Sequence, residues 1–302
     1  MDINDKLPEN LEWYKDQIAG HHPSVIRNGL RQIGIIKERG SILILKLVQE
    51  GVRGEREVAL YEKCKAEGSE LNGNASKKSL VYELRQFLPH YYGRRHIRIG
   101  TKVNEFIELE DISSPFKKPC IMDIKVGRIT YDPEATEAKK LAETTRAPSQ
   151  AIIGFRVLGY RVHSDISGKE FMTKDRVWGR QLKENEIQGA FEEYLQMRES
   201  NDDKIKIIDQ FMIHLEKLCR WFETQEIAHF YASSLLLVYE GHSKLKPNVD
   251  LRMIDFSHVF MVESGKDQNY LYGLNNVCKT LTDIRNGLDT LNKSHNYLID
   301  TQ

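Results

Sequence analysis

Apolar residues gather in short runs along the first third of the chain, and these runs predict strands. Residues 41–49 (SILILKLVQ) and 104–109 are apolar and partly β-branched, which is typical of buried strands. Between them, residues 54–66 have helical composition, with apolar side chains on one face. Residues 72–79 combine Gly, Asn and Ser without an apolar period, so we expect a loop there.

The pattern changes in the rest of the chain. Residues 110–118 are polar and contain a proline, which predicts a connector between a small strand-rich part and a larger mixed part. The charged residues 131–150 favour a helix, and residues 151–162 return to a strand pattern. Apolar residues at helical spacing predict two amphipathic helices, over 204–219 and 274–288, whose apolar stripes we assign to the core.

The stretch 119–127 carries the strongest chemical signal. It reads P-x-x-x-D-x-K-x-G, an apolar strand that places Asp123 and Lys125 two residues apart before a glycine turn. Side chains at this spacing point to the same face of a strand. A carboxylate and an ammonium on one face beside a glycine turn suit phosphate chemistry. A surface ion pair on an edge strand is the alternative interpretation.

Two further motifs follow in order. Residues 233–241 read SSLLLVYEG, and residues 252–258 read RMIDFSH, a short apolar strand that ends in an acid. Together with the motif at 119–127, they resemble the inositol polyphosphate kinase family, and most closely its multikinase branch. The resemblance extends from about Gln17 to about Leu281.

This resemblance implies an α+β fold with two lobes, distantly related to protein kinases. It implies a small β-rich N-lobe at residues 1–112, with a hinge at 110–112, and a larger mixed C-lobe at 113–302. The C-lobe is expected to include a helical segment that binds inositol phosphates, at about residues 130–185. The chain lacks the protein-kinase loop G-x-G-x-x-G, as does the family, which argues against protein phosphorylation and not against ATP use.

Composition narrows the choice of partners. The 302 residues include 44 Lys and Arg against 44 Asp and Glu, so we expect no direct nucleic-acid binding.

No apolar run approaches the ~20 residues of a membrane helix, and the acidic N-terminus does not resemble a secretory signal. The four cysteines are scattered without metal spacing, which favours reduced thiols in the cytoplasm or nucleus. We expect a monomer.

Two residues are candidates for nucleotide and metal binding. Lys46 lies inside an apolar strand, where an ammonium is costly unless it reaches a partner or the solvent. The resemblance implies that Lys46 contacts the ATP phosphates, and Glu57 on the next helix could orient it. Asp255 ends an apolar strand, a position suited to Mg²⁺, which prefers oxygen ligands. The resemblance makes Asp255 the metal ligand, and a capping or core aspartate is the alternative.

The resemblance assigns further roles beside these two residues. Lys125 is expected to contact the transferring phosphate or the acceptor hydroxyl. Asp123 either binds the nucleotide ribose or accepts a proton from that hydroxyl. His258 is expected near the phosphates or the substrate. The main-chain carbonyl of Glu110 and the N–H of Ile112 are expected to bind adenine, as the hinge of a kinase does.

The acceptor site needs several cations, because inositol phosphates are dense in negative charge. The resemblance places basic groups on the helical segment, and Arg53 could reach the same site from the small lobe. The expected acceptor-binding residues on that segment are Lys139, Lys140 and Arg146, with Arg180 as a weaker candidate. Each of these charges could instead be a solvated surface group. Ala142 and Glu143 stand where some multikinases carry a glutamine pair, which bears on the preferred isomer.

The function expected from these residues is the ATP- and Mg²⁺-dependent phosphorylation of inositol trisphosphate to tetrakis- and pentakisphosphate. Headgroups of phosphoinositide lipids are further possible acceptors. Two alternatives stay open. One is an inositol hexakisphosphate kinase that makes pyrophosphates, and the other is a scaffold or transcriptional partner in which catalysis is secondary. The presence of Lys46, Asp123, Lys125 and Asp255 argues against a dead kinase.

Overall fold

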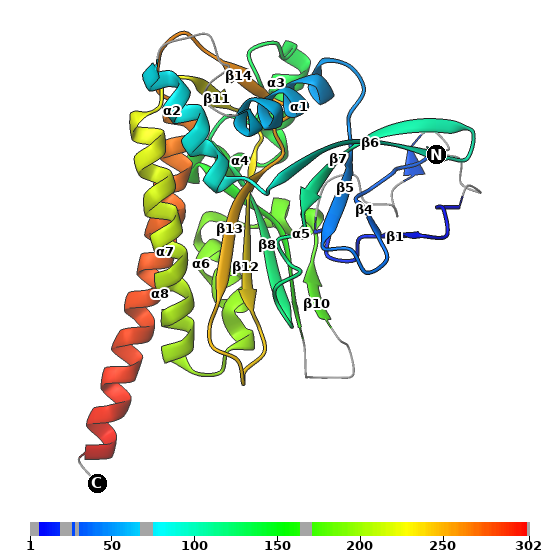
Figure 1. The fold of residues 1–302 in the computed structure, drawn as a ribbon. Helices are drawn as coiled ribbons and strands as arrows, with labels where there is room; N and C mark the ends of the chain where they lie inside the picture. The colour runs from blue at the N-terminus through cyan, green and yellow to red at the C-terminus, as the bar shows by residue number, and fades with distance from the viewer. Residues whose placement is uncertain (1–5, 19–25, 28–29, 67–74, 164–170, 301–302) are drawn as a thin grey trace.

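The protein is represented by a computed structural model that describes residues 6–18, 26–27, 30–66, 75–163 and 171–300. Figure 1 shows two sheets next to each other, with two long helices along the outer side of one of them. The predicted α+β class is confirmed.

The first sheet comes from the N-terminal third of the chain. Its strands are antiparallel, in the order β1-β4-β5-β7-β6. Their bounds are β1 (Leu11–Trp13), β4 (Ile36–Glu38), β5 (Leu43–Leu47), β6 (Tyr91–Ile99) and β7 (Lys102–Glu110). The strands predicted within 41–49 and over 104–109 are therefore confirmed. A separate short pair consists of β2 (Ile26–Arg27) and β3 (Leu30–Arg31).

The second sheet carries the motif with Asp123 and Lys125. It is antiparallel, in the order β10-β9-β8-β12-β13, with β8 in its centre. Its strands are β8 (Pro119–Val126), β9 (Phe155–His163), β10 (Phe171–Lys174), β12 (Ser234–Glu240) and β13 (Val249–Ile254). A shorter pair, β11 (Ala228–Phe230) with β14 (Val259–Met261), lies at one end. The central position of β8 excludes the interpretation of its motif as an edge-strand feature.

The helices of the chain cover the second sheet and one end of the molecule (Figure 1). Their bounds are α1 (Val52–Lys65), α2 (Ala75–Leu84), α3 (Glu137–Arg146), α4 (Pro148–Ile153), α5 (Arg176–Gln181), α6 (Ile187–Tyr194), α7 (Asn201–Thr224) and α8 (Gln268–Asp300). Short 3₁₀ turns are at Arg85–Phe87, Glu184–Glu186 and Leu195–Met197. The two predicted amphipathic helices are confirmed as α7 and α8, which pack side by side with their apolar faces toward the sheet.

Three predicted segments differ from the structure. The loop expected at 72–79 is wrong over 75–79, which form the start of α2, and 72–74 lie outside the described residues. The helix expected over 131–150 is α3 and α4 instead, because Pro148 disfavours helical backbone at the residue before it. The strand expected from residue 151 begins at Phe155, after α4 ends on Gly154 in the left-handed region (φ 77°).

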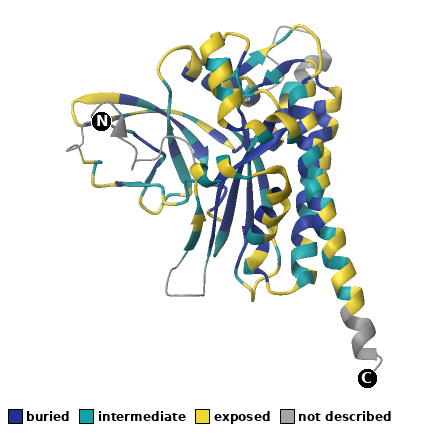
Figure 2. Ribbon diagram, turned by 180° about the vertical axis from the view of Figure 1, so that it is seen from behind, coloured by how far each residue is buried: buried dark blue, intermediate teal, exposed yellow. Residues whose placement is uncertain are grey.

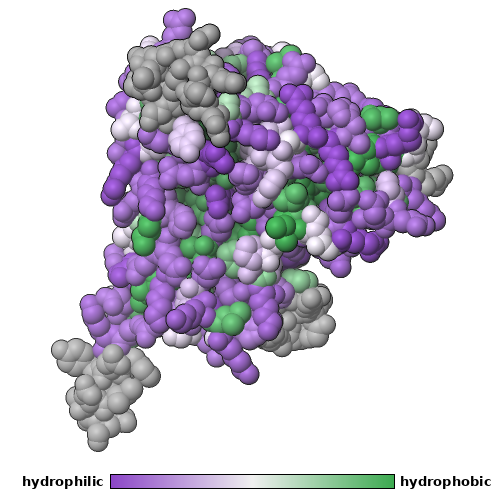
Figure 3. Space-filling model, in the orientation of Figure 1, coloured by the Kyte–Doolittle hydropathy of each residue, from purple (hydrophilic) through white to green (hydrophobic). Residues whose placement is uncertain are grey.

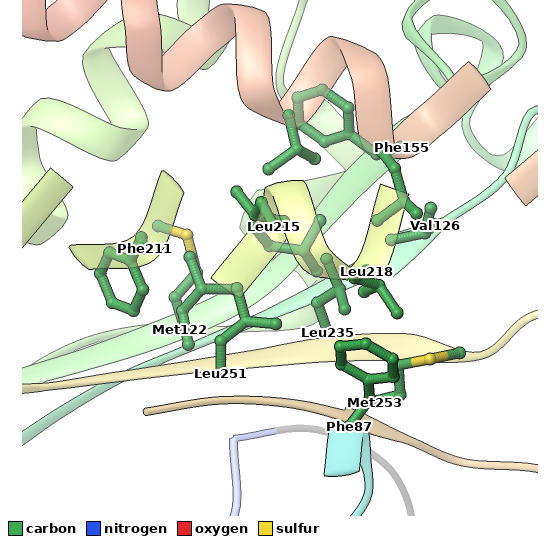
Figure 4. Packing of buried hydrophobic residues seen from close by; sticks show 14 of the residues in the cluster. Phe87, Met122, Val126, Phe155, Phe211, Leu215, Leu218, Leu235, Leu251 and Met253 are labelled. Carbon is green, nitrogen blue, oxygen red and sulfur yellow. The ribbon is translucent and has the colours of Figure 1, made fainter. Parts of the chain in front are cut away.

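The core is shared between the two parts of the chain. Figure 4 shows its centre, where side chains from α7 meet those of β8, β12 and β13. Residues of α1 and β7 belong to the same apolar cluster, while a smaller cluster lies on the other side of the first sheet. Figure 2 shows the corresponding buried band along the second sheet and the inner faces of the long helices. The lobe boundary predicted at residue 112 stays a prediction.

The surface is mostly polar. Figure 3 shows hydrophilic residues over most of one face, with hydrophobic residues in small separate patches. Within the described ranges, no helix combines the length and the apolar character that crossing a bilayer requires.

Candidate active site

Lys46 lies at the meeting point of the two sheets and makes two ion pairs. Its Nζ lies 2.6 Å from Glu57 Oε1 on α1 and 2.5 Å from Asp255 Oδ1, just after β13. Burial alone would lower the pKa of the Lys46 ammonium, but the carboxylates of Asp255 and Glu57 outweigh burial and raise that pKa above its ordinary value. Lys46 is therefore a permanent cation with carboxylates on two sides.

Glu57 also fixes the turn that carries Asp255. Its Oε1 accepts a hydrogen bond from the N–H of Phe256 at 3.1 Å, and its Oε2 accepts one from Ser257 Oγ at 3.4 Å. Gln49 Nε2 donates to the same Ser257 hydroxyl at 2.9 Å. Asp255 itself adopts a positive φ of 67°, which is uncommon for a residue other than glycine. The surrounding contacts hold this backbone, and the Asp255 side chain stays 42% exposed.

Asp123 is the second carboxylate of the site and is almost fully buried, at 4% exposure. Its Oδ1 has no hydrogen-bond partner among the described residues. Burial, followed by the negative charge of Asp255, raises the pKa of Asp123 to about 7. The carboxyl group is therefore divided between its protonated and ionised forms near neutral pH.

Lys125 and Arg156 are direct neighbours across β8 and β9. Neither makes a hydrogen bond or an ion pair through its side chain with the described residues, and Arg156 is only 7% exposed. Burial and the charge of Arg156 lower the pKa of Lys125, and burial and the charge of Arg180 lower the pKa of Arg156 to about 10. Like charges opposite each other destabilise a sheet unless an anion lies between them.

Arg180 joins this pair from α5. The helix approaches β9 closely, because Gly179 has no side chain: a Cβ there would lie 2.0 Å from the carbonyl oxygen of Val157. Burial and the charge of Arg146 lower the pKa of Arg180, whose Nε has no partner in the described part of the chain. Arg156 and Arg180 both line a small pocket between α4, α5 and β9.

His258 belongs to a separate polar group. Its Nδ1 lies 2.5 Å from Asp132 Oδ2, the same oxygen that lies 3.3 Å from Lys139 Nζ. Burial and the charges of Lys139 and Arg53 lower the pKa of His258 in spite of Asp132. Arg53, which is exposed at the start of α1, is close enough for its charge to act on His258. Three of the predicted residues are thus brought together around Asp132.

Two predicted acceptor-binding residues are engaged within their own helix. Lys140 Nζ lies 2.7 Å from Glu137 Oε1, and no described contact links Lys140 to the other site residues. Arg146 lies 2.6 Å from Glu143 Oε1 and acts on the pKa of Arg156 and Arg180. The charge of Arg146 therefore acts on Arg156 and Arg180, whereas the described ion pair of Lys140 stays within α3.

The predicted hinge follows β7 directly. Glu110 is the last residue of β7, and the N–H of Asp111 donates to the carbonyl of Ile42 beside β5 at 3.0 Å. Ile112 is buried, and its N–H has no acceptor within the described residues. An unused main-chain donor at this position is available to a ligand.

A metal would depend on few protein ligands. Among the described residues, no group of three or more His, Cys, Asp or Glu side chains is arranged to hold a metal ion. Mg²⁺ is commonly held by one or two carboxylates together with substrate phosphates and water. The exposed Asp255 and the unpartnered Oδ1 of Asp123 fit that requirement.

Sequence reasoning missed two contributors to this site. Arg156 lies within the predicted strand 151–162, to which no chemistry was assigned, and its position opposite Lys125 depends on the strand register. Asp132 appeared only as part of the helical segment, and its contacts with His258 and Lys139 come from tertiary packing. The assembled site offers a fixed cation beside two carboxylates, and next to them a set of cations that form no ion pair with the described residues, an arrangement that suits phosphoryl transfer between two polyanions.

Comparison with known proteins identifies the relatives of this chain. Residues 106–282 match the family described as inositol polyphosphate kinase. The inositol polyphosphate multikinase of Homo sapiens is 35% identical over 233 residues, covering 76% of this chain and 51% of that protein. Inositol hexakisphosphate kinase 3 of Mus musculus is 29% identical over 210 residues, covering 62% and 52%. This chain thus spans about half the length of these two curated relatives.

A solved structure has the same fold. The inositol phosphate multikinase Ipk2 from S. cerevisiae, crystallised in complex with ADP and Mn²⁺, superposes with a TM-score of 0.64 at 19% identity, covering 80% of this chain and 99% of that one. At this identity the likeness concerns the fold alone. The predicted two-lobed fold is confirmed at that level.

Proposed function

Because this chain belongs to the inositol polyphosphate kinase family, we propose that it is an ATP-dependent kinase of the multikinase type. It phosphorylates ring hydroxyls of inositol trisphosphate to give the tetrakis- and then the pentakisphosphate. The observation that carries the proposal is the group formed by Lys125, Arg156 and Arg180, three cations that form no ion pair with the described residues and lie beside the buried Asp123. An acceptor that carries several phosphates supplies the charge that this group lacks.

The nucleotide is proposed to bind between the two sheets. The main-chain groups of Glu110 and Ile112 contact adenine, and the Lys46 ammonium donates to the phosphates. Mg²⁺ held by Asp255 neutralises phosphate charge when it is bound. Glu57 keeps Lys46 and the Asp255 turn in place, as their contacts already do in the structure.

The acceptor is proposed to lie over Lys125, Arg156 and Arg180, with its reacting hydroxyl toward Asp123. A pKa of about 7 supports the role of Asp123 as the acceptor of the hydroxyl proton, because a base is most effective when its pKa lies near the working pH. His258 is proposed to donate a hydrogen bond to a phosphate from the nitrogen that does not face Asp132.

The test is a product assay. Purified protein is incubated with ATP, Mg²⁺ and inositol 1,4,5-trisphosphate, and the products are resolved by anion-exchange chromatography. Successive tetrakis- and pentakisphosphate support the proposal, and an arrest at the tetrakisphosphate contradicts the multikinase type. A parallel reaction with inositol hexakisphosphate addresses the alternative favoured by the mouse relative, and one with phosphoinositide vesicles addresses lipid headgroups. No product in any reaction would favour the scaffold.

A further inference from the structure

The first turns of α8 form hydrogen bonds with the loop that follows β8, the strand that carries Lys125. The side-chain amide of Asn269 bonds to both main-chain groups of Ile129: its Oδ1 accepts from the N–H at 2.8 Å, and its Nδ2 donates to the carbonyl at 2.9 Å. The loop passes this close because Gly127 has φ 104°, and a Cβ there would lie 2.7 Å from Asn269 Nδ2. Asn269 therefore acts on this loop as a neighbouring strand would.

The same helix also holds the segment that precedes the Arg156 strand. Helix α4 ends there, and its last carbonyls have no partner inside the helix. Tyr272 Oη donates to the carbonyl of Ile152 at 2.8 Å, and Asn276 Nδ2 donates to that of Ile153 at 2.8 Å. The next carbonyl, at Gly154, accepts from the N–H of Gly127 at 2.7 Å. The two loops are thus joined to each other as well as to α8.

A glycine in α8 makes this contact possible. A Cβ at Gly273 would lie 2.2 Å from the carbonyl oxygen of Gly154 and 2.9 Å from the nitrogen of Gly127. The helix therefore lies directly against both loops at the point where they meet, with Asn269 on one side of the contact and Asn276 on the other. Any larger residue at Gly273 would push the helix and the loops apart.

Both loops border the cations of the proposed acceptor site. Lys125 lies two residues before Gly127, and Arg156 lies two residues after Gly154. Neither cation forms an ion pair with the described residues, and burial and the charge of Arg156 lower the pKa of Lys125 in spite of nearby carboxylates, so the separation of the two side chains depends on the backbone that holds the two strand ends. We infer that Asn269 and Asn276 are positioning residues of the acceptor site, which keep Lys125 and Arg156 at the spacing that a polyphosphorylated acceptor requires. This inference rests on the proposed function.

The experiment compares three asparagine-to-alanine variants of the same helix. Asn269→Ala removes the hydrogen bonds to Ile129, and Asn276→Ala removes the hydrogen bond to the carbonyl of Ile153. Asn275→Ala is the matched control, because Asn275 is exposed and makes no hydrogen bond with the described residues. We expect kcat/KM for inositol 1,4,5-trisphosphate to fall roughly tenfold to a hundredfold in the first two variants, with KM for ATP within about twofold of the parent protein. The control should match the parent in both constants.

A merely structural role would give a different result. It would lower the thermal midpoint, or change both KM values together, without a selective effect on the acceptor. A double-mutant cycle sharpens the distinction: Asn276→Ala should have little further effect on the acceptor KM in an Arg156→Gln background, because the group that it positions is gone. Full additivity in this cycle, or equal kinetics for all three alanine variants, overturns the inference. A parent protein without kinase activity would instead contradict the proposed function.

Discussion

The site contains two clusters of charged residues, one around Lys46 and one around Lys125. They differ in whether their cations are paired with carboxylates. Around Lys46, one cation lies within 2.6 Å of two carboxylate oxygens, from Glu57 and Asp255. Around Lys125, three cations gather without an ion pair among the described residues, and burial, followed by the charge of a neighbouring arginine, lowers the pKa of each. The cation of the first group is paired with carboxylates before any ligand arrives, whereas no described carboxylate forms an ion pair with the cations of the second.

This difference distinguishes charged residues that stabilise the fold from charged residues that are available to bind a ligand. A buried charge with its partner keeps its geometry, and removing the partner leaves an expensive isolated charge. Buried cations without an ion-pair partner raise the free energy of the folded protein, and a bound polyanion removes this cost. The same type of side chain should therefore have opposite effects on stability in the two groups.

The largest effect should follow from removing Asp255, the exposed acid of the cluster around Lys46. Asp255→Asn retains the shape of the side chain but loses the charge for Lys46 and for a metal. We expect turnover to fall at least about a thousandfold with the fold intact, as measured by product formation and circular dichroism. Asp283→Asn is the control, because Asp283 is an exposed acid of α8 without a described contact. Normal turnover in Asp255→Asn would remove Asp255 from the proposed metal site.

Asp123 lies between the two groups, and its titration should report on both. The pKa of about 7 in the folded protein exceeds the ordinary value of ~4 expected in the unfolded chain. The proton is therefore bound more tightly in the folded state. This contribution to stability is complete below pH ~4 and is lost as the pH rises through about 7.

The corresponding measurement is urea unfolding across this pH range. The free energy of unfolding should lose about 1.4 kcal/mol for each unit of the pKa difference, and Asp123→Asn should remove this loss. Acceptor phosphorylation by the parent protein should rise with pH through about 7, as the carboxylate forms. Identical pH profiles of stability for the parent and the variant would show that Asp123 keeps an ordinary pKa.

A smaller effect should follow from removing Lys46, the cation that is paired with Glu57 and Asp255. Lys46→Met leaves Glu57, which is 1% exposed, without its partner. We expect a loss of about 3 kcal/mol in the free energy of unfolding, measured by urea denaturation. Lys102→Met is the control, because its ion pair with Glu50 is exposed and should contribute little. Equal losses in the two variants would mean that the Lys46 pairs do not stabilise the fold.

The smallest effect should be an increase in the free energy of unfolding, where the previous substitution lowers it. Arg156→Met removes one of the unpaired cations, so we expect the free energy of unfolding to rise by about 1 kcal/mol, the size of one relieved repulsion. The KM for inositol trisphosphate should rise at least about tenfold, as expected for a lost charge-assisted hydrogen bond. Arg98→Met, at an exposed edge-strand position without an ion pair in the described ranges, should change neither value. A destabilised Arg156→Met protein would indicate that Arg156 supports the fold.

Local patterns predicted much of the fold. The apolar runs around Lys46 and Asp123 are strands, and the two stripes at helical spacing are α7 and α8. The errors came where tertiary contacts or a single proline outweighed composition. The polar residues at 75–79 form a helix, and Pro148 divides the segment expected to be one helix.

The linear sequence was sufficient to name the family and to propose the candidate site residues, because the order of three motifs and the spacing of Asp123 and Lys125 on one strand are properties of the chain itself. Their partners were decided only in three dimensions. Arg156 faces Lys125 through a strand register, and Asn269 meets Ile129 across 140 residues of chain. Periodicity reports which face of an element is buried, but charges act through space, so only the packed structure determines which of them are neutralised and which are left for a ligand.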